Sequence, residues 1–221
     1  MTSPIPRLEA LRVDLAALRR RGVDHHAIEA VLPVAWLQQA LRDTDAEVER
    51  PGSVALQLWL QPEGVVVAQG PLRAGFSVPC GRCLSPAAVD ADTEIFATYM
   101  PSAAVPEDDD LDEDDRTPDQ TPDVWGYDGP ILDLDPMVAE QVALAYPMRA
   151  LCKRGEGCRG LCSNCGYELN ELAAEVRRCP QCHHEVPLTP VADLPSDGGG
   201  ARDERIGDGP LAAALRGLEL E

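Results

Sequence analysis

Residues 158–182 have the sequence CRGLCSNCGYELNELAAEVRRCPQC, which contains five of the eight cysteines in the chain. Cys162 and Cys165 form one C-x-x-C pair, and Cys179 and Cys182 form a second pair after thirteen intervening residues. Two residues between cysteines let both sulfurs face one cation from a tight turn, and the glycine after Cys165 suits the backbone of such a turn. Two such turns on a short hairpin supply four sulfur ligands in tetrahedral geometry. The stretch therefore predicts a structural four-cysteine zinc site with no open coordination position.

The other four cysteines form a more dispersed set, Cys80 and Cys83 in VPCGRCL and Cys152 and Cys158 in LCKRGEGC. Each pair is incomplete alone, but together they supply a second set of four ligands. A zinc ion shared by them would join the two distant segments. CGRC also resembles a thioredoxin-type redox motif, which needs a strand before it and a helix directly after it. Here LSPAAVDADTEIFATYM indicates a loop and a strand. Unpaired buried thiols and iron–sulfur ligation remain open alternatives.

The histidines are weaker candidates for metal ligands. His183 and His184 directly follow Cys182 and could compete for a cation, but eight cysteines already complete two sets. We expect these two histidines, and also His25 and His26, to be exposed to solvent.

The composition of the 221 residues limits the class of protein. Hydrophobic residues make up 44% of the chain but aromatic residues only 4%, so the core must be mainly aliphatic. The first residues contain no apolar run of signal-peptide type, and no window approaches the ~20 apolar residues of a membrane span. We expect a soluble cytoplasmic protein. Cytoplasmic thiols stay reduced, so eight cysteines favour metal binding or redox chemistry over disulfides.

The net charge of −19 is concentrated in one segment. Residues 106–123, PEDDDLDEDDRTPDQTPD, carry ten acidic side chains and a single arginine, and therefore supply −9 of the total. An acidic, proline-rich segment with few apolar residues is typical of a disordered loop. Residues 188–221 are expected to form a mostly flexible tail.

The remaining sequence predicts an α+β fold with a β-rich N-terminal part over residues 1–105. VALQLWL, VVVAQG, LRAGFSVPC and AAVDADTEIFATYMP are short, turn-bounded strands, which suggest an antiparallel sheet or a small barrel. A helix is expected near 33–43, where PVAWLQQALRDT has apolar residues at helical spacing. The stretch LEALRVDLAALRRRG is ambiguous between helix and strand.

Residues 124–151 are expected to add a strand and an amphipathic helix that packs on the sheet. In ILDLDPMVAEQVALAYP, Asp135 is a plausible N-cap and Pro136 fits the first helical position. Residues 152–187 then complete the fold as a C-terminal, zinc-ribbon-like module with four cysteine ligands.

The order of these motifs resembles the YceD-like family, named for accumulation of the large ribosomal RNA subunit. The resemblance rests on CGRCL, DLDPMVAEQVALAYPMRALC, CRGLCSNCGYELN and CPQC, and extends over roughly residues 54–182. It implies a bacterial, non-enzymatic factor that supports 23S ribosomal RNA synthesis, processing or stability and large-subunit assembly. The sequence contains no Walker loop, GxGxxG motif or Ser-His-Asp order that would indicate an enzyme.

Two alternative functions belong to other classes. The cysteines could serve thiol redox chemistry or zinc handling, or the ribbon could be a transcription-type interaction module. The overall acidity gives the last alternative no general attraction to DNA.

Basic side chains gather near the cysteines. They are Arg82, Arg149, Lys153, Arg154, Arg159, Arg177 and Arg178. Arginine is well shaped for bidentate contact with phosphate, but the same side chains could instead neutralise the negative charge of zinc thiolates. The expected partners are ribosomal RNA or a ribosome-assembly protein, with no membrane and no small-molecule substrate.

Overall fold

The computed structural model describes residues 7–105, 124–173 and 175–186. The predicted disordered loop at 106–123 and the predicted flexible tail at 188–221 lie outside these residues. No helix in the described part of the chain is both long and apolar enough to cross a membrane.

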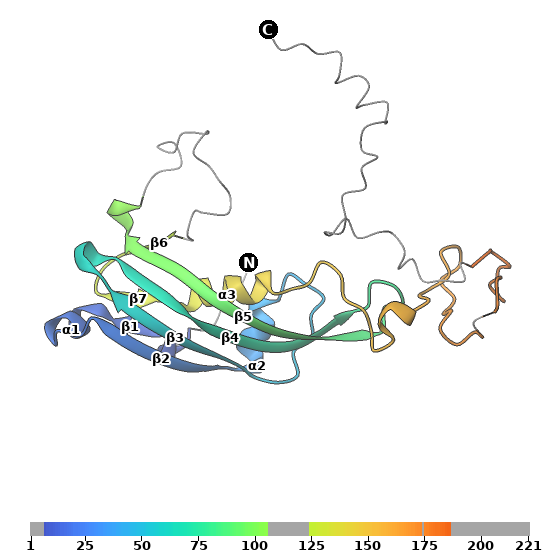
Figure 1. The fold of residues 1–221 in the computed structure, drawn as a ribbon, viewed down its shortest axis with the longest axis horizontal. Coiled ribbons are helices and arrows are strands. Elements are labelled where there is room, and N and C mark those ends of the chain that lie inside the picture. Colours follow the sequence, from blue (N-terminus) through green and yellow to red (C-terminus); the bar gives the residue numbers. More distant parts are fainter. Residues whose placement is uncertain (1–6, 106–123, 174, 187–221) are drawn as a thin grey trace, which may run out of the picture.

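The centre of the fold is an open five-stranded sheet (Figure 1). Its strands lie in the order β2 (His25–Leu32), β3 (Gly52–Leu60), β4 (Val66–Pro79), β5 (Pro86–Pro101) and β6 (Val124–Tyr127). Neighbouring strands are antiparallel except β5 and β6, which are parallel. The α+β class and the antiparallel sheet are therefore confirmed. Of the two architectures left open, the sheet is the one observed.

Alternation along the strands gives the sheet one buried face. On β3, Val54, Leu56 and Leu58 are buried, while the residues between them are exposed or half-buried. The same period of two continues on β4 and β5, as expected for a sheet with one covered face. The buried face meets helices α2 (Val34–Ala40) and α3 (Asp135–Leu144), which contact each other.

The N-terminal stretch that was ambiguous in sequence contains both kinds of structure. A short 3₁₀ turn η1 (Glu9–Leu11) leads into β1 (Arg12–Asp14) and then into helix α1 (Leu15–Arg20). The Asp14 carboxylate caps α1 by accepting a hydrogen bond from the Ala17 N–H. Strand β1 pairs with β7 (Ile131–Asp133) in a separate two-stranded sheet, so chain segments more than 100 residues apart lie side by side.

The prediction that Asp135 caps α3 is wrong, because its carboxylate has tertiary partners. Leu134 is the N-cap residue, and no side chain caps this helix. The buried Asp135 carboxylate instead accepts hydrogen bonds from the Trp36 indole at 3.1 Å and from the Leu8 N–H at 2.9 Å. Asp135 thus ties α3 to α2 and to the N-terminal segment.

Strands β4 and β5 form a long hairpin that extends toward the cysteine-rich end of the molecule (Figure 1). Their pairing is continuous from Val66↔Tyr99 to Pro79↔Pro86. The six residues left to form the turn are 80–85, CGRCLS. The first C-x-x-C pair is therefore the turn of this hairpin, and the sheet itself sets its position.

Candidate metal centres

Three C-x-x-C turns in the chain have the same backbone geometry. They begin at Cys80, Cys162 and Cys179. In each turn the carbonyl of the first cysteine accepts a hydrogen bond from the N–H four residues later, at 3.0, 2.8 and 2.9 Å respectively. The N–H of the first cysteine donates to the carbonyl five residues later, at 2.9, 2.8 and 2.9 Å. A turn closed in this way holds its two sulfurs on one side.

The residue after the second cysteine has a positive φ in all three turns. Gly166 has φ of 74°, as its lack of a side chain suggested, but Leu84 and His183 adopt 61°. Non-glycine residues at positive φ cost free energy and tend to cluster at functional sites. The sequence signal for these two positions was available, since each occupies the same place relative to its cysteines as Gly166.

The first group of four cysteines lies where the β4–β5 hairpin meets the segment after α3. We call Cys80, Cys83, Cys152 and Cys158 the hairpin cluster. All four are buried, and their sulfurs lie within 4.8 Å of one another. The Cys80–Cys158 and Cys83–Cys152 sulfur distances are 4.0 and 3.7 Å.

The Cys152–Cys158 side of the hairpin cluster is a different kind of turn. It contains a 3₁₀ turn η6 (Gly155–Gly157), with Gly155 at φ 53° and its N–H donating to the Cys152 carbonyl at 2.8 Å. The Gly81 N–H donates to the Ala150 carbonyl at 2.9 Å and fastens the hairpin turn to this segment. Backbone contacts therefore bring together two cysteine pairs that are about 70 residues apart.

The second group lies at the end of the molecule opposite α1 (Figure 1). We call Cys162, Cys165, Cys179 and Cys182 the ribbon cluster, and their sulfurs also lie within 4.8 Å of one another. Cys165 and Cys182 are half-buried, and the other two cysteines are buried. The Cys162–Cys182 and Cys165–Cys179 distances are 3.6 and 3.5 Å. Two isolated bridges, Leu161↔Glu168 and Arg178↔Glu185, frame the cluster.

Both clusters fit a cation with four sulfur ligands. Tetrahedral coordination with bonds of ~2.3 Å places neighbouring sulfurs roughly 3.8 Å apart. The sulfur distances of 3.5 to 4.0 Å in the two clusters agree with this spacing. Each cluster could hold a metal ion, and four thiolates suit the metals that prefer soft ligands, such as zinc and iron.

Backbone N–H groups favour the thiolate form of several cysteines. Burial opposes ionisation of Cys80, but N–H groups of Cys83, Arg82 and Cys152 outweigh it and lower its pKa to about 6. The Asn164 amide and the His184 N–H likewise lower the pKa of Cys182 to about 6. Hydrogen bonds to the charged form of a group have this effect.

Not every thiol in the clusters ionises as readily. Burial raises the pKa of Cys158 to about 12. The Tyr167 N–H favours the Cys165 thiolate, but burial and the neighbouring cysteines oppose its charge, and its pKa is raised to about 12. Four thiols packed together cannot all become negative without a cation between them, so metal binding would release protons.

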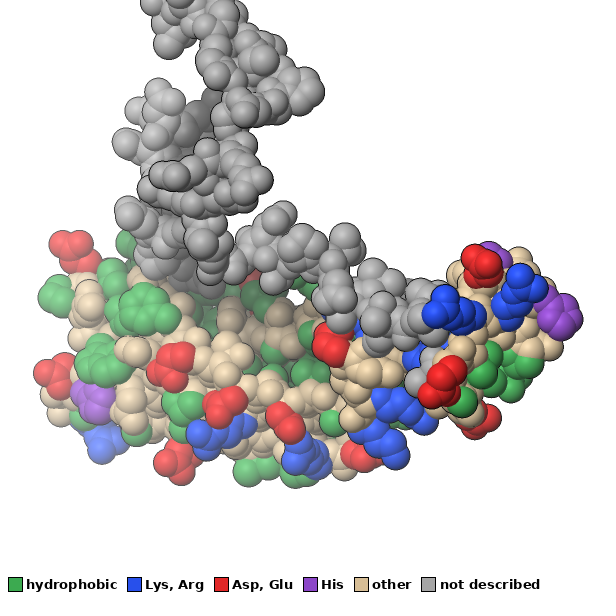
Figure 2. Space-filling model, turned by 45° about the vertical axis from the view of Figure 1, so that its right-hand side comes forward, with side chains coloured by type: hydrophobic (Ala, Val, Ile, Leu, Met, Phe, Trp, Pro, Cys, Tyr) green, Lys and Arg blue, Asp and Glu red, His purple; other side chains and the backbone are tan. Residues whose placement is uncertain are grey.

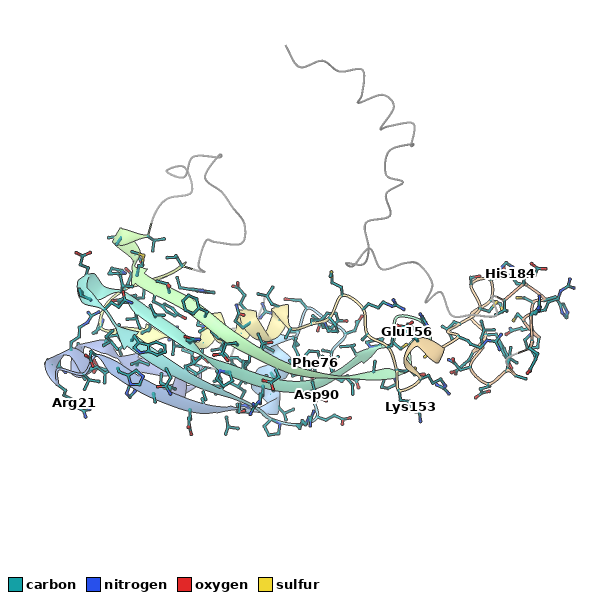
Figure 3. The ribbon with its side chains drawn as sticks, in the orientation of Figure 1. Arg21, Phe76, Asp90, Lys153, Glu156 and His184 are labelled. Carbon is teal, nitrogen blue, oxygen red and sulfur yellow. The ribbon has the colours of Figure 1, made fainter. Side chains whose placement is uncertain are left out.

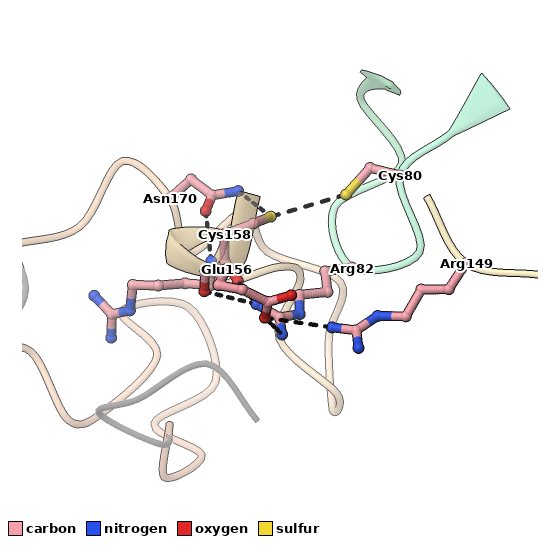
Figure 4. Close-up of polar contacts among 7 residues, drawn as sticks. Cys80, Arg82, Arg149, Glu156, Cys158 and Asn170 are labelled. Carbon is pink, nitrogen blue, oxygen red and sulfur yellow. Dashed lines mark hydrogen bonds and ion pairs between the residues drawn. The ribbon is translucent and has the colours of Figure 1, made fainter. Parts of the chain in front are cut away.

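The seven basic residues near the cysteines fall into two groups, and three of them have partners in the structure. The Arg82 side chain donates to the Glu156 and Cys158 carbonyls and forms an ion pair with Glu156 at 2.7 Å (Figure 4). Arg149 also pairs with Glu156, at 3.6 Å. The Arg159 guanidinium donates to carbonyls of Leu172, Ala173 and Val176 and so ties down the chain between the two ribbon turns.

Four of these seven basic side chains have no hydrogen bond or ion pair to any residue that the structure describes. We call Lys153, Arg154, Arg177 and Arg178 the free cations. All are exposed, and they lie at the cysteine-rich end, where Figure 2 shows basic side chains among acidic ones and histidines. Lys153 and Arg154 also line a cavity of about 540 Å³ with Ser85 of the hairpin turn and Pro86 of β5.

The histidines are mostly placed as expected. His25, His183 and His184 are exposed, whereas His26 is half-buried on β2. His25 lies 5.5 Å from the Trp59 ring, centre to centre. None of the four belongs to either cysteine cluster.

Comparison with known protein families identifies the chain. The family model described as "Large ribosomal RNA subunit accumulation protein YceD" matches residues 68–195, which is more than half of the sequence. The chain belongs to the YceD family. The match begins in β4 and includes all eight cysteines, so both clusters lie in the part shared with the YceD model. No curated protein and no solved structure matches the chain.

Proposed function

We propose that this YceD family member is a non-enzymatic factor with two structural zinc ions that supports 23S ribosomal RNA accumulation and large-subunit assembly. The observation that carries the proposal is the position of two complete four-cysteine clusters within the YceD match. A metal ion held by four protein sulfurs has no position left for an activated water or a substrate. The zinc ions would therefore stabilise a binding surface rather than perform chemistry.

The two clusters would hold zinc through all eight cysteines. Cys80, Cys83, Cys152 and Cys158 would bind one ion, and Cys162, Cys165, Cys179 and Cys182 the other. Structural zinc of this type contributes roughly 10–16 kcal/mol of apparent binding free energy in small domains. That contribution suits the ribbon cluster, where Leu169 and Val186 are the only buried apolar side chains beside the cysteines among the residues that the structure describes.

The partner favoured by the site is ribosomal RNA, contacted through the four free cations. The other three basic side chains, Arg82, Arg149 and Arg159, already have protein partners. They would stabilise this surface and would not be the main contacts to phosphate. The free cations have no such partners among the described residues and can approach phosphate without breaking an existing bond. If all four neutralise phosphates of single-stranded RNA, the slope of log affinity against log salt should be near −3, from about 0.7 per contact.

Binding of 23S RNA fragments at several salt concentrations tests this proposal. Lys153→Ala/Arg154→Ala and Arg177→Ala/Arg178→Ala should each flatten the slope by about 1.4, from about 0.7 per lost contact. Arg20→Ala/Arg21→Ala is the matched control, because these arginines are also exposed and without a described partner. Figure 3 places Arg21 at the opposite end of the molecule from Lys153. Equal slopes in all variants would mean that the ribosomal role depends on a protein partner.

The exposure of the ribbon cluster favours a second candidate, a redox or zinc-handling protein. Cys165 and Cys182 are only half-buried and could exchange zinc or react with oxidants. Alkylation separates the two candidates. Structural zinc thiolates should resist alkylation until a chelator is added, whereas a redox pair should be modified at once.

A further inference from the structure

The two clusters are separated by only three residues of chain. Arg159, Gly160 and Leu161 lie between Cys158 of the hairpin cluster and Cys162 of the ribbon cluster. The Leu161 N–H donates to the Arg82 carbonyl in the hairpin turn, and the Leu169 N–H donates to the Gly160 carbonyl, both at 3.0 Å. These two backbone hydrogen bonds hold the link against the hairpin turn on one side and against the ribbon on the other.

Gly160 allows the link to approach the hairpin turn closely. Its φ is 76°, and a Cβ atom at this position would lie 2.8 Å from the Arg82 carbonyl oxygen. A side chain here would push the ribbon away from the hairpin turn. The contact between the two clusters therefore depends on glycine.

One side chain of the ribbon reaches a sulfur of the other cluster. Asn170 lies between the two C-x-x-C turns of the ribbon, and its Nδ2 donates to the Cys158 Sγ at 3.6 Å (Figure 4). Its Oδ1 accepts the Arg159 N–H at 2.7 Å, which fixes the orientation of the amide so that Nδ2 faces the sulfur. Nδ2 also contacts Glu168 Oε1 at 3.3 Å.

We infer that Asn170 is a positioning residue that makes metal binding at the hairpin cluster depend on metal binding at the ribbon cluster. Hydrogen bonds to a ligand from outside the coordination sphere orient it and tune its affinity for metal. Asn170 can donate to Cys158 only while the ribbon is folded, and few of the ribbon's described apolar side chains are buried to hold it together. Metal in the ribbon cluster should therefore raise the affinity of the hairpin cluster for metal. Metal in the hairpin cluster must then raise the affinity of the ribbon cluster by the same factor.

This inference rests on the proposed metal sites, and a cycle of variants in the full-length chain tests it. Zinc affinity of the hairpin cluster is measured by chelator competition, with the cobalt–thiolate absorption as an independent signal. Asn170→Ala should weaken the hairpin cluster by 10- to 100-fold, the usual effect of losing such a contact. Cys162→Ser/Cys165→Ser should lower the zinc affinity of the hairpin cluster by a similar factor. Adding Asn170→Ala to this double variant should lower that affinity little further.

Asn170→Asp separates the donor from a purely structural role. Aspartate can still accept the Arg159 N–H but presents a negative oxygen, not an N–H, to the Cys158 sulfur. We expect a larger loss of affinity than for Asn170→Ala, and affinity close to that of the wild type would overturn the inference. Glu171→Ala, an exposed neighbour without a described side-chain partner, is the control and should bind metal as the wild type does.

The experiment also distinguishes failure of the inference from failure of the sites. A wild-type chain that binds fewer than two metal ions overturns the proposed sites. A wild-type chain that binds two, with hairpin-cluster affinity unchanged within twofold in Asn170→Ala, overturns the coupling.

Discussion

Leu84, directly after the hairpin-cluster residue Cys83, has a strained backbone conformation. It follows Cys83 at φ 61°, and its side chain is 66% exposed, so little burial compensates for the unfavourable backbone. The left-handed conformation costs L-residues about 1–2 kcal/mol. Contacts that close the turn, including the Leu84 N–H bond to the Cys80 carbonyl, must offset this cost.

Replacement of Leu84 by glycine should therefore stabilise the protein. We expect Leu84→Gly to raise the free energy of unfolding by about 0.5–1 kcal/mol, because relief of strain exceeds the extra entropy of glycine in the unfolded chain. Leu144→Gly is the matched control, since Leu144 is 67% exposed but ends helix α3. Glycine there should destabilise the protein. Denaturant melts of the zinc-loaded chains measure the free energy of unfolding of both variants. A Leu84→Gly variant less stable than the wild type would contradict the claim that Leu84 is strained.

At the residue scale, the sequence predicted the grouping of the cysteines better than it predicted the contacts of the basic side chains. Spacing alone separates the cysteines into two sets of four, and the structure brings together those same sets. Spacing cannot show that Arg82 faces Glu156 or that Arg159 donates to the carbonyls of the ribbon. These partners are far from Arg82 in sequence or depend on how the ribbon folds, so their roles become clear only in three dimensions.

At the scale of elements, one buried hydrogen bond joins α2 to α3 within their shared apolar core. The Trp36 indole donates to Asp135, and burial raises the pKa of that carboxyl while the Leu8 and Trp36 N–H groups oppose the shift. A raised folded pKa means that ionisation of Asp135 destabilises the fold as pH rises through that pKa. The Trp36 N–H reduces this penalty, because it favours the charged form.

Loss of the indole N–H should therefore cost most at neutral pH. We expect Trp36→Phe to lower the free energy of unfolding by about 1.5–3 kcal/mol for the hydrogen bond to the charged group, beyond any change in packing. The cost should shrink as pH falls and Asp135 becomes protonated. Urea melts across a pH series measure it, with Trp59→Phe, at a ring 38% exposed on β3, as the control. A penalty that does not change with pH would contradict the role given to Asp135.

Local patterns predicted most elements but not their long-range pairing. Turn-bounded strand patterns predicted β3 and β5, but VVVAQG and LRAGFSVPC, expected as two strands, form the single strand β4. Apolar spacing predicted α2, and Pro136 predicted the start of α3. The pairing of β1 with β7 and the use of Asp135 by Trp36 join segments about 100 or more residues apart. Asp135 illustrates the reason, because its position before Pro136 is equally typical of a helix cap until a distant indole takes its carboxylate.

At the scale of the whole molecule, the sheet and the ribbon have separate apolar cores. The larger core includes buried residues of strands β1 to β5 and β7, helices α1 to α3 and the four cysteines of the hairpin cluster, and the partly buried Trp125 and Tyr127 of β6 pack against it. The ribbon cluster has its own small group of buried residues, Cys162, Leu169, Cys179 and Val186. The sheet can therefore remain folded when the ribbon does not.

Removal of metal should unfold the two parts in order. Hydrogen exchange followed by mass spectrometry during chelation should show backbone protection lost first in the ribbon, residues 162–186. The central strands β3, β4 and β5 should keep their protection from exchange, because their apolar core does not depend on the ribbon. Simultaneous loss of protection in sheet and ribbon would contradict the separation into two cores.

The central claim is that each four-cysteine cluster holds one zinc ion, and native mass spectrometry of the purified full-length chain tests it most directly. The wild-type mass should exceed that of the apo chain by two zinc ions, and Cys80→Ser/Cys83→Ser should carry one ion, retained by the ribbon cluster. A wild-type chain with less than one zinc and no iron in its place, or a variant that loses both ions or neither, would contradict the account.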